Sequence, residues 1–483
     1  MINDSTTSSL IRCPLQVQAS AYPDRYALID RHYGFTYAHL EGLIEHFSHK
    51  LNALGVRCGS KVAIYAKEDW CYVAVLLALW RMGGIAIPLN TRHPLTRVGE
   101  WLQEISADRL IVDSTFVNRA PRGIPVIFRD HLCRIAVERP RTVRWQSLVH
   151  PATILFTSGS TDRPRAVLHT YGNHYFSALG ANMNMPLGPG DRWLLALPLY
   201  HVGGLAILFR AFISGATVVF AHREKSLFRQ LQRQEITHLS VVPTQLRRLL
   251  EEGKEAPAAL KAVLVGGSAV SEDLIREAQA LNWPIYLTYG LTEMASQVTT
   301  TAAPVEDVLS SGSVLPFRAV EIAADGEILV KGDTLFRGYV RGSEVIASVD
   351  EHGWYHTGDV GYIDESGQLH VIGRKDNMFI SGGENIYPEV IERVLEDLPA
   401  VAEVVVVAVP DAEFGHRPAA IVRWKNHPLT LEEIRAQVAN RLARYELPVA
   451  LFPWPERVEA TFKIHRPFFQ AYAEQLWMQE SYG

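Results

Sequence analysis

The chain has 483 residues, a formal net charge of −5, and 48% hydrophobic and 20% charged residues. This length accommodates about three domains of ~150 residues, or one large domain with a smaller one. The hydrophobic and charged fractions are those of an ordinary folded protein, which excludes a disordered or collagen-like chain. The slightly acidic balance provides no basic field for a phosphodiester backbone, so we expect no role in nucleic-acid binding.

The cysteines and the apolar segments indicate a cytoplasmic protein. Cys13, Cys58, Cys71 and Cys133 form neither a CxxC pair nor a zinc-like spacing, so we predict four reduced thiols. The N-terminus lacks the basic and apolar regions of a signal peptide. The most apolar stretch, 73–89, is interrupted by an arginine and two glycines and is too short to cross a bilayer. The sequence therefore predicts a soluble protein without a membrane span.

Through its first half the chain alternates short β-branched runs with helical patterns. In chain order, the predicted elements are strand 62–66, helix 73–83, strand 85–89, strand 217–221, helix 226–234, strand 238–243, helix 246–253 and strand 261–267. Buried strands that alternate with helices are typical of βαβ units, so we predict an α/β fold with parallel, helix-flanked sheets. Such sheets bind ligands at the carboxyl ends of their strands.

Beyond about residue 310 the pattern changes to hairpins and then to a compact α+β arrangement. Two hairpins are expected at 320–332 and 361–374, the first with Asp325-Gly326 as its turn. A helix, a strand and a second helix are expected at 388–398, 401–410 and 429–445. This change in the pattern of predicted elements indicates a large domain over 1–374 and a small domain over 375–483.

The segment 154–170 contains the first motif whose residues suggest a binding function. A strand at 153–156 runs into the turn Thr157-Ser158-Gly159-Ser160-Thr161, which Arg165 follows. Hydroxyls and backbone N–H groups in a tight turn form an anion-binding concavity, and a guanidinium adds positive charge. The segment is not a Walker A loop, because GxxxxGK[ST] is absent. Taken alone, such a turn is more commonly a plain loop.

Three further segments accompany this loop: TYGLTE at 288–293, GWYHTGDVGYID at 353–364 and GRKDNMFISGGENIYPEVIE at 373–392. In order and spacing, from about residue 20 to the end, the chain resembles the adenylate-forming superfamily of acyl- and aryl-CoA ligases, luciferases and peptide-synthetase adenylation domains. The resemblance implies a large N-terminal domain with a β-rich subdomain, followed by a small, mobile C-terminal α+β domain.

The resemblance also implies the nucleotide contacts. The loop from Thr157 to Arg165 would hold the β- and γ-phosphates of ATP. Gly267 and Ser268, in Gly266-Gly267-Ser268, would lie beside the adenine and the acyl group. Tyr289, next to Gly290, would stack on the adenine.

The resemblance also implies roles for the remaining polar groups of these motifs. Thr292 would bind the α-phosphate and Glu293 would hold Mg²⁺. Asp359 would accept hydrogen bonds from both ribose hydroxyls, and Arg374 would reach the same sugar.

The small domain would supply the mobile groups. Asp376 would lie at the hinge, and the strand region around Gly382 and Gly383 would approach the pantetheine of CoA. Lys463, in TFKIHRP, matches the lysine that bridges the substrate carboxylate and the α-phosphate, although its neighbours match the family pattern only in part.

These roles describe a two-step reaction with ATP, Mg²⁺ and coenzyme A. A carboxylate attacks the α-phosphorus and releases pyrophosphate, and the charge that develops on phosphoryl oxygens calls for cations and aimed donors. The carboxylate is already ionised near pH 7, so the first step needs no general base. The CoA thiol then attacks the acyl-adenylate and releases AMP.

The phosphate loop departs from the family pattern. Asp162, Arg165 and Ala166 stand where Gly, Lys and Gly are usual. Arginine keeps the charge of lysine but not its geometry, and a carboxylate opposes a nearby phosphate. These departures leave open the affinity for ATP, and they admit a second hypothesis, an adenylate-binding regulator without turnover.

The segment LPLYHVGGL at 197–205 indicates which kind of acid is the substrate. Peptide-synthetase domains usually carry an aspartate here for the α-amine of an amino acid, and this chain has His201. The wider stretch resembles the o-succinylbenzoate–CoA ligases of menaquinone and phylloquinone biosynthesis, whose acid carries a ring and two carboxylates. Candidate residues of the acyl pocket are His201, Ser268, Thr288, Ser296 and Gln297. Another aryl- or medium-chain acyl-CoA ligase and an enzyme that loads a carrier protein remain alternatives, and the family suggests a homodimer.

Overall fold

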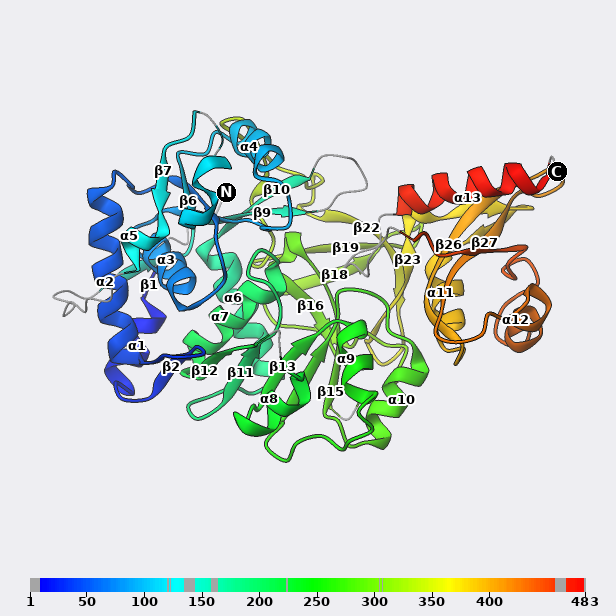
Figure 1. Cartoon of the computed structure of the whole chain (residues 1–483), viewed down its shortest axis with the longest axis horizontal. Coiled ribbons are helices and arrows are strands. Elements are labelled where there is room, and N and C mark those ends of the chain that lie inside the picture. Colours follow the sequence, from blue (N-terminus) through cyan, green and yellow to red (C-terminus); the bar gives the residue numbers. More distant parts are fainter. Residues whose placement is uncertain are drawn as a thin grey trace.

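The computed structural model describes residues 9–119, 121, 123–133, 144–157, 164–222, 225–303, 305, 307–456 and 466–481. A large α/β part is followed by a smaller part that carries the C-terminal helix at the far end of the molecule (Figure 1). This is the fold class that the sequence predicts. Within the described ranges, no helix combines the length and the apolar character that crossing a bilayer requires.

An eight-stranded sheet forms the first half of the large part, in the order β21-β20-β10-β9-β5-β4-β6-β7. Strands β9, β5, β4, β6 and β7 are parallel, whereas β10, β20 and β21 add an antiparallel edge. The bounds are β4 Lys61–Tyr65, β5 Ile85–Pro88, β6 Arg109–Val112, β7 Val126–Phe128, β9 Pro151–Thr157, β10 Arg165–Thr170, β20 Gly338–Arg341 and β21 Glu344–Ile346.

A nine-stranded sheet forms the second half, in the order β17-β16-β15-β14-β13-β11-β12-β2-β3. Its centre is parallel, and the pairs β2–β3, β15–β16 and β16–β17 are antiparallel. The predicted parallel sheets are therefore confirmed for the buried centres, while hairpins extend the edges. The bounds are β2 Tyr26–Ile29, β3 Gly34–Thr36, β11 Arg192–Leu195, β12 Thr217–Phe220, β13 His238–Val241, β14 Ala262–Val265, β15 Ile285–Leu291, β16 Ser296–Thr300 and β17 Ser313–Val314.

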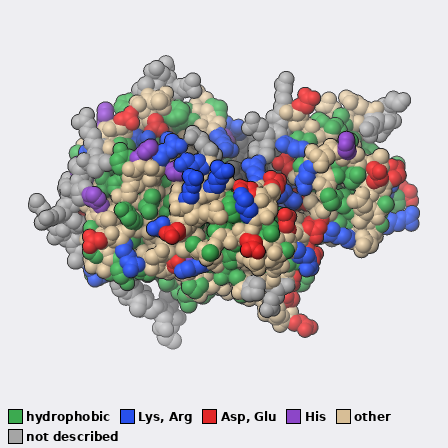
Figure 2. Space-filling model, turned by 60° about the horizontal axis from the view of Figure 1, so that its bottom comes forward, with side chains coloured by type: hydrophobic (Ala, Val, Ile, Leu, Met, Phe, Trp, Pro, Cys, Tyr) green, Lys and Arg blue, Asp and Glu red, His purple; other side chains and the backbone are tan. Residues whose placement is uncertain are grey.

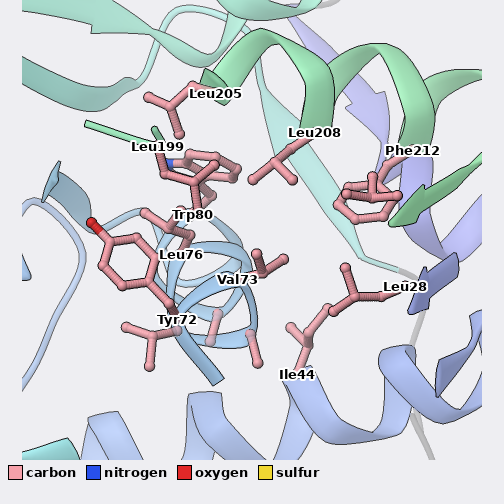
Figure 3. Packing of buried hydrophobic residues seen from close by; sticks show 14 of the residues in the cluster. Leu28, Ile44, Tyr72, Val73, Leu76, Trp80, Leu199, Leu205, Leu208 and Phe212 are labelled. Atoms are coloured by element: carbon pink, nitrogen blue, oxygen red, sulfur yellow. The ribbon is translucent and has the colours of Figure 1, made fainter. Parts of the chain in front are cut away.

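Helices cover these sheets and share one core with both of them. Side chains of α2, α3 and α7 point toward one another (Figure 3) and join Val62 and Ile64 of β4 and Val218 of β12 in a single buried cluster. Helix α3 begins where the Asp69 carboxylate accepts hydrogen bonds from the Cys71 and Tyr72 N–H groups at 3.0 and 3.1 Å. The helices of the large part are α1 Pro14–Ala21, α2 Tyr37–Ala53, α3 Trp70–Arg81, α4 Leu95–Glu104, α5 Arg129–Leu132, α6 Tyr171–Asn184, α7 Val202–Ser214, α8 Leu227–Arg233, α9 Pro243–Leu250 and α10 Glu272–Ala280.

The β-rich region predicted beyond residue 310 is a four-stranded antiparallel sheet in the order β18-β19-β22-β23. Both predicted hairpins are present, and the first turns at Gly326, whose φ of +82° favours glycine. The bounds are β18 Arg318–Ile322, β19 Glu327–Gly332, β22 Tyr355–Ile363 and β23 Leu369–Arg374, and a separate two-stranded sheet pairs β1 Leu10–Arg12 with β8 Trp145–Ser147.

The smaller part is built on the sheet β26-β27-β28, with helices on both of its faces. Along β26, Val404 and Val406 pack with α11 and α12, whereas Val405 and Val407 face α13, which explains the unbroken valine run. Helix α12 ends at Val438, short of the predicted helix to 445, and α13 was not predicted. The bounds are β24 Phe379–Ser381, β25 Glu384–Ile386, α11 Pro388–Glu396, β26 Val401–Asp411, β27 Gly415–Trp424, α12 Leu431–Val438, β28 Ala450–Pro453 and α13 Arg466–Ser481.

The prediction of four reduced thiols is wrong for two of them. Cys71 and Cys133 form a disulfide with Cα atoms 5.9 Å apart, although 62 residues separate them in sequence. Cysteine spacing along the chain gave no hint of the pair, because packing of α3 against the end of α5 brings the two together. Cys13 and Cys58 are free thiols, the first buried and the second exposed.

Candidate active site

The strands β14 and β15 end in the two turns predicted to hold the adenine. Gly266 follows β14, and a Cβ atom there would lie 2.7 Å from the Thr288 side chain. Gly290 is required for a similar reason, because its Cβ would lie 2.1 Å from the Ser296 carbonyl oxygen. Gly267 adopts φ +92°, and Ser268 is exposed beside it. The predicted residues therefore lie at the carboxyl ends of neighbouring parallel strands.

Tyr289, Asp359 and Arg374 form one hydrogen-bonded group. The Tyr289 hydroxyl donates to Asp359 Oδ2 at 2.6 Å, and Arg374 Nη1 donates to Asp359 Oδ1 at 2.9 Å. Burial raises the pKa of the Asp359 carboxyl, and the Arg374 guanidinium opposes that rise. Residues from β15, β22 and β23 thus hold the Asp359 carboxyl group in a fixed place.

Thr292 and Glu293 lie in a single 3-10 turn, Thr292–Met294, directly after β15. The Thr292 carbonyl accepts a hydrogen bond from His169 Nε2 at 2.7 Å, and the Glu293 carbonyl accepts one from the Phe336 N–H at 2.8 Å. Burial lowers the pKa of His169 to about 4, so the ring is neutral near pH 7 and donates. Ala295, at φ +53°, ends the turn in the left-handed region, a conformation that these contacts hold in place.

Glu293 fits a Mg²⁺ ligand by the chemistry of its donor atoms. The side chain is 9% exposed, and its Oε1 accepts a hydrogen bond from the Tyr339 hydroxyl at 2.8 Å. A carboxylate oxygen fixed in this way is a hard ligand of the kind that Mg²⁺ prefers. Thr292, the residue before Glu293, lies in the same turn.

The phosphate motif is the connection of a β-hairpin. Thr157 ends β9 and pairs with Arg165, which begins β10. Ser158, Gly159, Ser160, Thr161 and Asp162 lie outside the described residues. The Arg165 guanidinium lies over the Tyr339 ring, 5.5 Å from its centroid, and a hydrogen bond with Tyr339 raises the pKa of Arg165.

Sequence analysis missed the buried arginine of α7. Arg210 is 1% exposed, its Nη2 donates to the Ser296 hydroxyl at 3.3 Å, and it lies over the Trp193 ring. Its Nε has no hydrogen-bond partner, and among the described residues no carboxylate pairs with it. Burial and repulsion from Arg318 lower the pKa of Arg210 to about 9. The available signal was a single charge inside the apolar helix VGGLAILFRAFIS.

Arg318 is a second buried arginine close to the same segment. Its Nη1 donates to the Gln297 carbonyl at 2.5 Å and its Nη2 to the Ser177 carbonyl at 3.2 Å. Burial lowers the pKa of Arg318 to about 9. Two guanidinium groups thus make the region around Ser296 and Gln297 electropositive, and it lies next to the turn that holds Thr292.

The other acyl-pocket candidates lie at the start of α7 and on the strands β15 and β16. His201 is exposed at the N-terminus of α7, nine residues before Arg210, and its ring lies 4.6 Å from that of Tyr200. Thr288 donates to the Thr299 carbonyl at 2.7 Å and so joins β15 to β16. The structure brings Thr288, Ser296 and Gln297 together on the paired strands, and it places His201 at the start of the neighbouring helix.

The residues expected in the small domain follow β23. Asp376 accepts a hydrogen bond from Arg374 Nη2 at 3.1 Å, in the 3-10 turn Lys375–Asn377. Gly382 and Gly383 form the tip of the β24–β25 hairpin with φ of +58° and +94°. Lys463 lies outside the described residues, three positions before α13.

Figure 2 shows Lys and Arg side chains gathered on one face of the molecule, with Asp and Glu side chains nearby.

A fold of two helix-flanked sheets, the hydrogen-bonded group of Tyr289, Asp359 and Arg374, and the turn that holds Thr292 and Glu293 define an adenylate-forming enzyme. The chain belongs to the AMP-binding enzyme family, whose sequence model matches residues 15–340, and the AMP-binding enzyme C-terminal domain matches residues 390–461.

Within this family the chain is similar to ligases that act on o-succinylbenzoate. The chain is 33% identical over 452 residues to the 2-succinylbenzoate–CoA ligase of Bacillus subtilis (strain 168), covering 91% of this chain and 93% of the relative. The o-succinylbenzoate CoA synthetase structure from B. subtilis with the acyl-adenylate intermediate has a TM-score of 0.87 at 32% identity, covering 95% and 98% of the two chains. A double mutant of that enzyme, bound to a product analogue, has a TM-score of 0.70 at 33% identity, covering 94% and 96%.

Proposed function

We propose that this chain is an ATP-dependent ligase that joins o-succinylbenzoate to coenzyme A through an acyl-adenylate. The observation that carries the choice of acid is Arg210, a fully buried guanidinium without a carboxylate partner among the described residues. A buried, unpaired cation is costly, and an acid with a second carboxylate offsets that cost when it binds. The similarity to ligases of this acid supports the same conclusion.

The large part binds ATP in this proposal. Tyr289 stacks on the adenine, and Asp359 and Arg374 hold the ribose. Thr292 binds the α-phosphate, while Thr157 and the loop that follows it hold the outer phosphates.

The first half-reaction needs positioning and positive charge. The substrate carboxylate attacks the α-phosphorus, the bond to the bridging oxygen breaks, and pyrophosphate leaves. Glu293 would hold Mg²⁺, which would supply positive charge for the phosphoryl oxygens. Lys463 neutralises the entering carboxylate and the α-phosphate together, and Arg210 anchors the far carboxylate so that the reacting one faces the phosphorus.

The second half-reaction needs a different arrangement of the small part. Lys463 withdraws, and the hairpin tip at Gly382 and Gly383 approaches the pantetheine. The two B. subtilis structures support such a movement, because nearly the same sequence gives TM-scores of 0.87 with adenylate and 0.70 with product analogue. We place the hinge at Asp376, with 1–374 as the large domain and 375–483 as the small one.

The proposal extends to a homodimer in the cytoplasm, where ATP and CoA are available. Light scattering on the purified chain measures the mass directly. A mass twice that of the 54.0 kDa chain supports the dimer, and a monomer refutes it.

Mass spectrometry tests the function. The purified full chain is incubated with Mg-ATP, CoA and, separately, o-succinylbenzoate, benzoate, 4-coumarate, octanoate or amino acids. We expect AMP release and a CoA thioester with o-succinylbenzoate, and little turnover of the others. Turnover of a different acid alone contradicts the substrate but keeps the mechanism. An adenylate that forms without transfer to free CoA favours carrier-protein loading, and no AMP from any acid favours the non-catalytic regulator.

A further inference from the structure

Tyr339 joins the turn that holds Glu293 to the end of the phosphate loop. It lies in β20, directly opposite Val167 of β10, so Arg165, two residues before Val167, is its diagonal neighbour on the paired strand. The Tyr339 hydroxyl contacts Glu293 Oε1 at 2.8 Å, and the face of its ring lies under the Arg165 guanidinium. One side chain therefore contacts both the acidic and the basic group of this region.

A second tyrosine fixes the direction of the hydrogen bonds. The hydroxyls of Tyr339 and Tyr355 are 2.8 Å apart, and Tyr355 is 7% exposed. An ionised carboxylate accepts hydrogen bonds and cannot donate, so the Tyr339 proton points to Glu293. Tyr355 therefore donates to Tyr339, and each hydroxyl polarises the next toward the carboxylate. Burial and the charge of Glu293 raise the pKa of Tyr339 to about 12, which keeps the chain of donors protonated.

Packing leaves this pair little freedom to turn away. The Phe336 ring meets Tyr339 edge to face at 4.9 Å and Tyr355 at 5.4 Å between centroids. The Phe336 N–H also donates to the Glu293 carbonyl at 2.8 Å. The backbone and the side chain of Glu293 are thus held from the same cluster.

We propose that Tyr339, supported by Tyr355, is a positioning residue that sets the Glu293 carboxylate for Mg²⁺ and the Arg165 guanidinium for the outer phosphates of ATP. The two halves of the contact differ in chemistry. The ring contacts the cation alone, whereas the hydroxyl contacts the metal ligand and also interacts with the Arg165 guanidinium. This inference rests on the proposed function for the identity of the nucleotide and the metal, and it adds a residue that none of the sequence motifs contains.

Two substitutions at one position separate the two halves. Tyr339→Phe removes the hydroxyl and keeps the ring, whereas Tyr339→Leu removes both. Equilibrium binding of ATP by the full chain is measured by calorimetry, once in a Mg²⁺ titration and once in EDTA. We expect Tyr339→Phe to need about tenfold more Mg²⁺ for half-maximal enhancement of ATP binding, the usual range for loss of a group that orients a metal ligand. In EDTA its ATP affinity falls less than that of Tyr339→Leu, because the ring still lies under the Arg165 guanidinium, and Tyr339→Leu weakens binding under both conditions.

Controls distinguish positioning from a general loss of structure. Tyr355→Phe shifts the Mg²⁺ requirement in the same direction by less, and Tyr362→Phe, at a half-exposed tyrosine stacked on His370, leaves it unchanged. Thermal unfolding midpoints check that each variant is folded.

Three results overturn the proposal. They are an unchanged Mg²⁺ requirement in folded Tyr339→Phe, equal losses for the Phe and Leu variants in EDTA, and a wild-type chain whose ATP binding ignores Mg²⁺. Failure of the proposed function has a different signature. The wild-type chain then binds ATP with Mg²⁺ dependence but forms no adenylate with any acid.

Discussion

At the scale of the residue, Arg210 is the side chain whose surroundings say most about the substrate. Burial between α7 and β16 removes water from this guanidinium. In its place the guanidinium has a hydrogen bond to one hydroxyl and contact with one aromatic ring, and Arg318 repels it. Arg318 differs, because two backbone carbonyls accept its hydrogen bonds. Among the described residues neither arginine has a carboxylate partner, and the Nε of each is without a hydrogen-bond partner, but Arg210 has fewer acceptors than Arg318. In the proposed function an anionic ligand balances the charge of Arg210.

Replacing Arg210 tests this assignment directly. We expect Arg210→Leu to lower kcat/KM for o-succinylbenzoate roughly 30- to 150-fold, since a hydrogen bond to a charged group contributes about 2–3 kcal/mol. Arg210→Lys should retain part of the activity. Folding should not suffer, because removing an unpaired buried charge is neutral or stabilising.

The matched control is Arg233→Leu, at an exposed arginine of α8, which should leave the kinetics unchanged. Benzoate provides a second control because it lacks the far carboxylate. A fall in kcat/KM that is as large for benzoate as for o-succinylbenzoate would contradict a role for Arg210 in binding the second carboxylate.

At the scale of the element, the local sequence pattern predicted the bounds of those strands and helices that depend on neighbouring residues alone. Strands β4, β12, β13 and β14 begin and end close to their predicted bounds because short apolar runs that alternate with helical patterns leave few alternatives. The predicted helix at 429–445 ends at Val438, and beyond it the Arg441 side chain pairs with Asp397, the residue that follows α11. That ion pair joins residues far apart in sequence, so no periodicity in the window reveals it.

The residues of the candidate site also fall into those that the sequence predicted and those that it missed. Tyr289, Asp359 and Arg374 were predictable because they lie in the ordered motifs that resemble those of a known family, and the three meet in the structure. Arg210 and Tyr339 were not predicted, because neither lies in such a motif and each is distinguished only by what packs against it. A residue's burial and its partner across a sheet are properties of the assembled fold.

The disulfide gives an element-scale prediction about α3. Closing a loop of 62 residues stabilises a protein by about 4 kcal/mol in the chain-entropy account, so Cys133→Ser should lower the free energy of unfolding by up to that amount. Chemical unfolding of the oxidised chain, with and without reductant, measures the effect.

Cys58→Ser is the control, because this exposed thiol is outside the pair and its loss should change little. Thiol titration gives an independent check, with two reactive groups expected in the denatured, unreduced chain and four after reduction. Four reactive groups before reduction would contradict the disulfide.

At the scale of the whole molecule, the proposed function assigns Lys463, a group of the small part, to one of the two half-reactions. In sequence, Lys463 precedes α13 by three residues, and Arg466 ties the start of α13 to Glu392 of α11 through two hydrogen bonds at 2.7 and 2.9 Å. The proposed rearrangement therefore brings Lys463 to the α-phosphate for adenylation and removes it for thioester formation.

This division of labour predicts unequal damage from Lys463→Ala. Formation of the acyl-adenylate should fall by orders of magnitude, because charge on the attacking carboxylate and the phosphate is no longer neutralised. Conversion of supplied acyl-adenylate and CoA to thioester should stay near the wild-type rate. Rapid-quench assays of the two steps make the comparison, and equal losses in both would refute the division.

The whole molecule should also lose stability in mild acid through its buried histidines. Burial lowers the pKa of His169 and of His238 to about 4, against about 6.5 in the unfolded chain. Between these values the unfolded chain binds more protons than the folded one, so the free energy of unfolding falls as the pH falls through this window. Each of the two histidines should account for about 2 kcal/mol between pH 7 and pH 5.

Urea unfolding at the two pH values tests the prediction at His238, which lies away from the nucleotide residues. Near this ring, Asp191 raises the pKa and Lys261 lowers it, but burial dominates both. His238→Gln removes the titration, so the difference between pH 7 and pH 5 should shrink by about 2 kcal/mol even if the variant is less stable at both. His352→Gln, at an exposed histidine, should leave the difference unchanged. An equal pH dependence in wild type and His238→Gln would show that this histidine is accessible to protons in the folded protein, and the loss of stability in acid would then have to come from other groups.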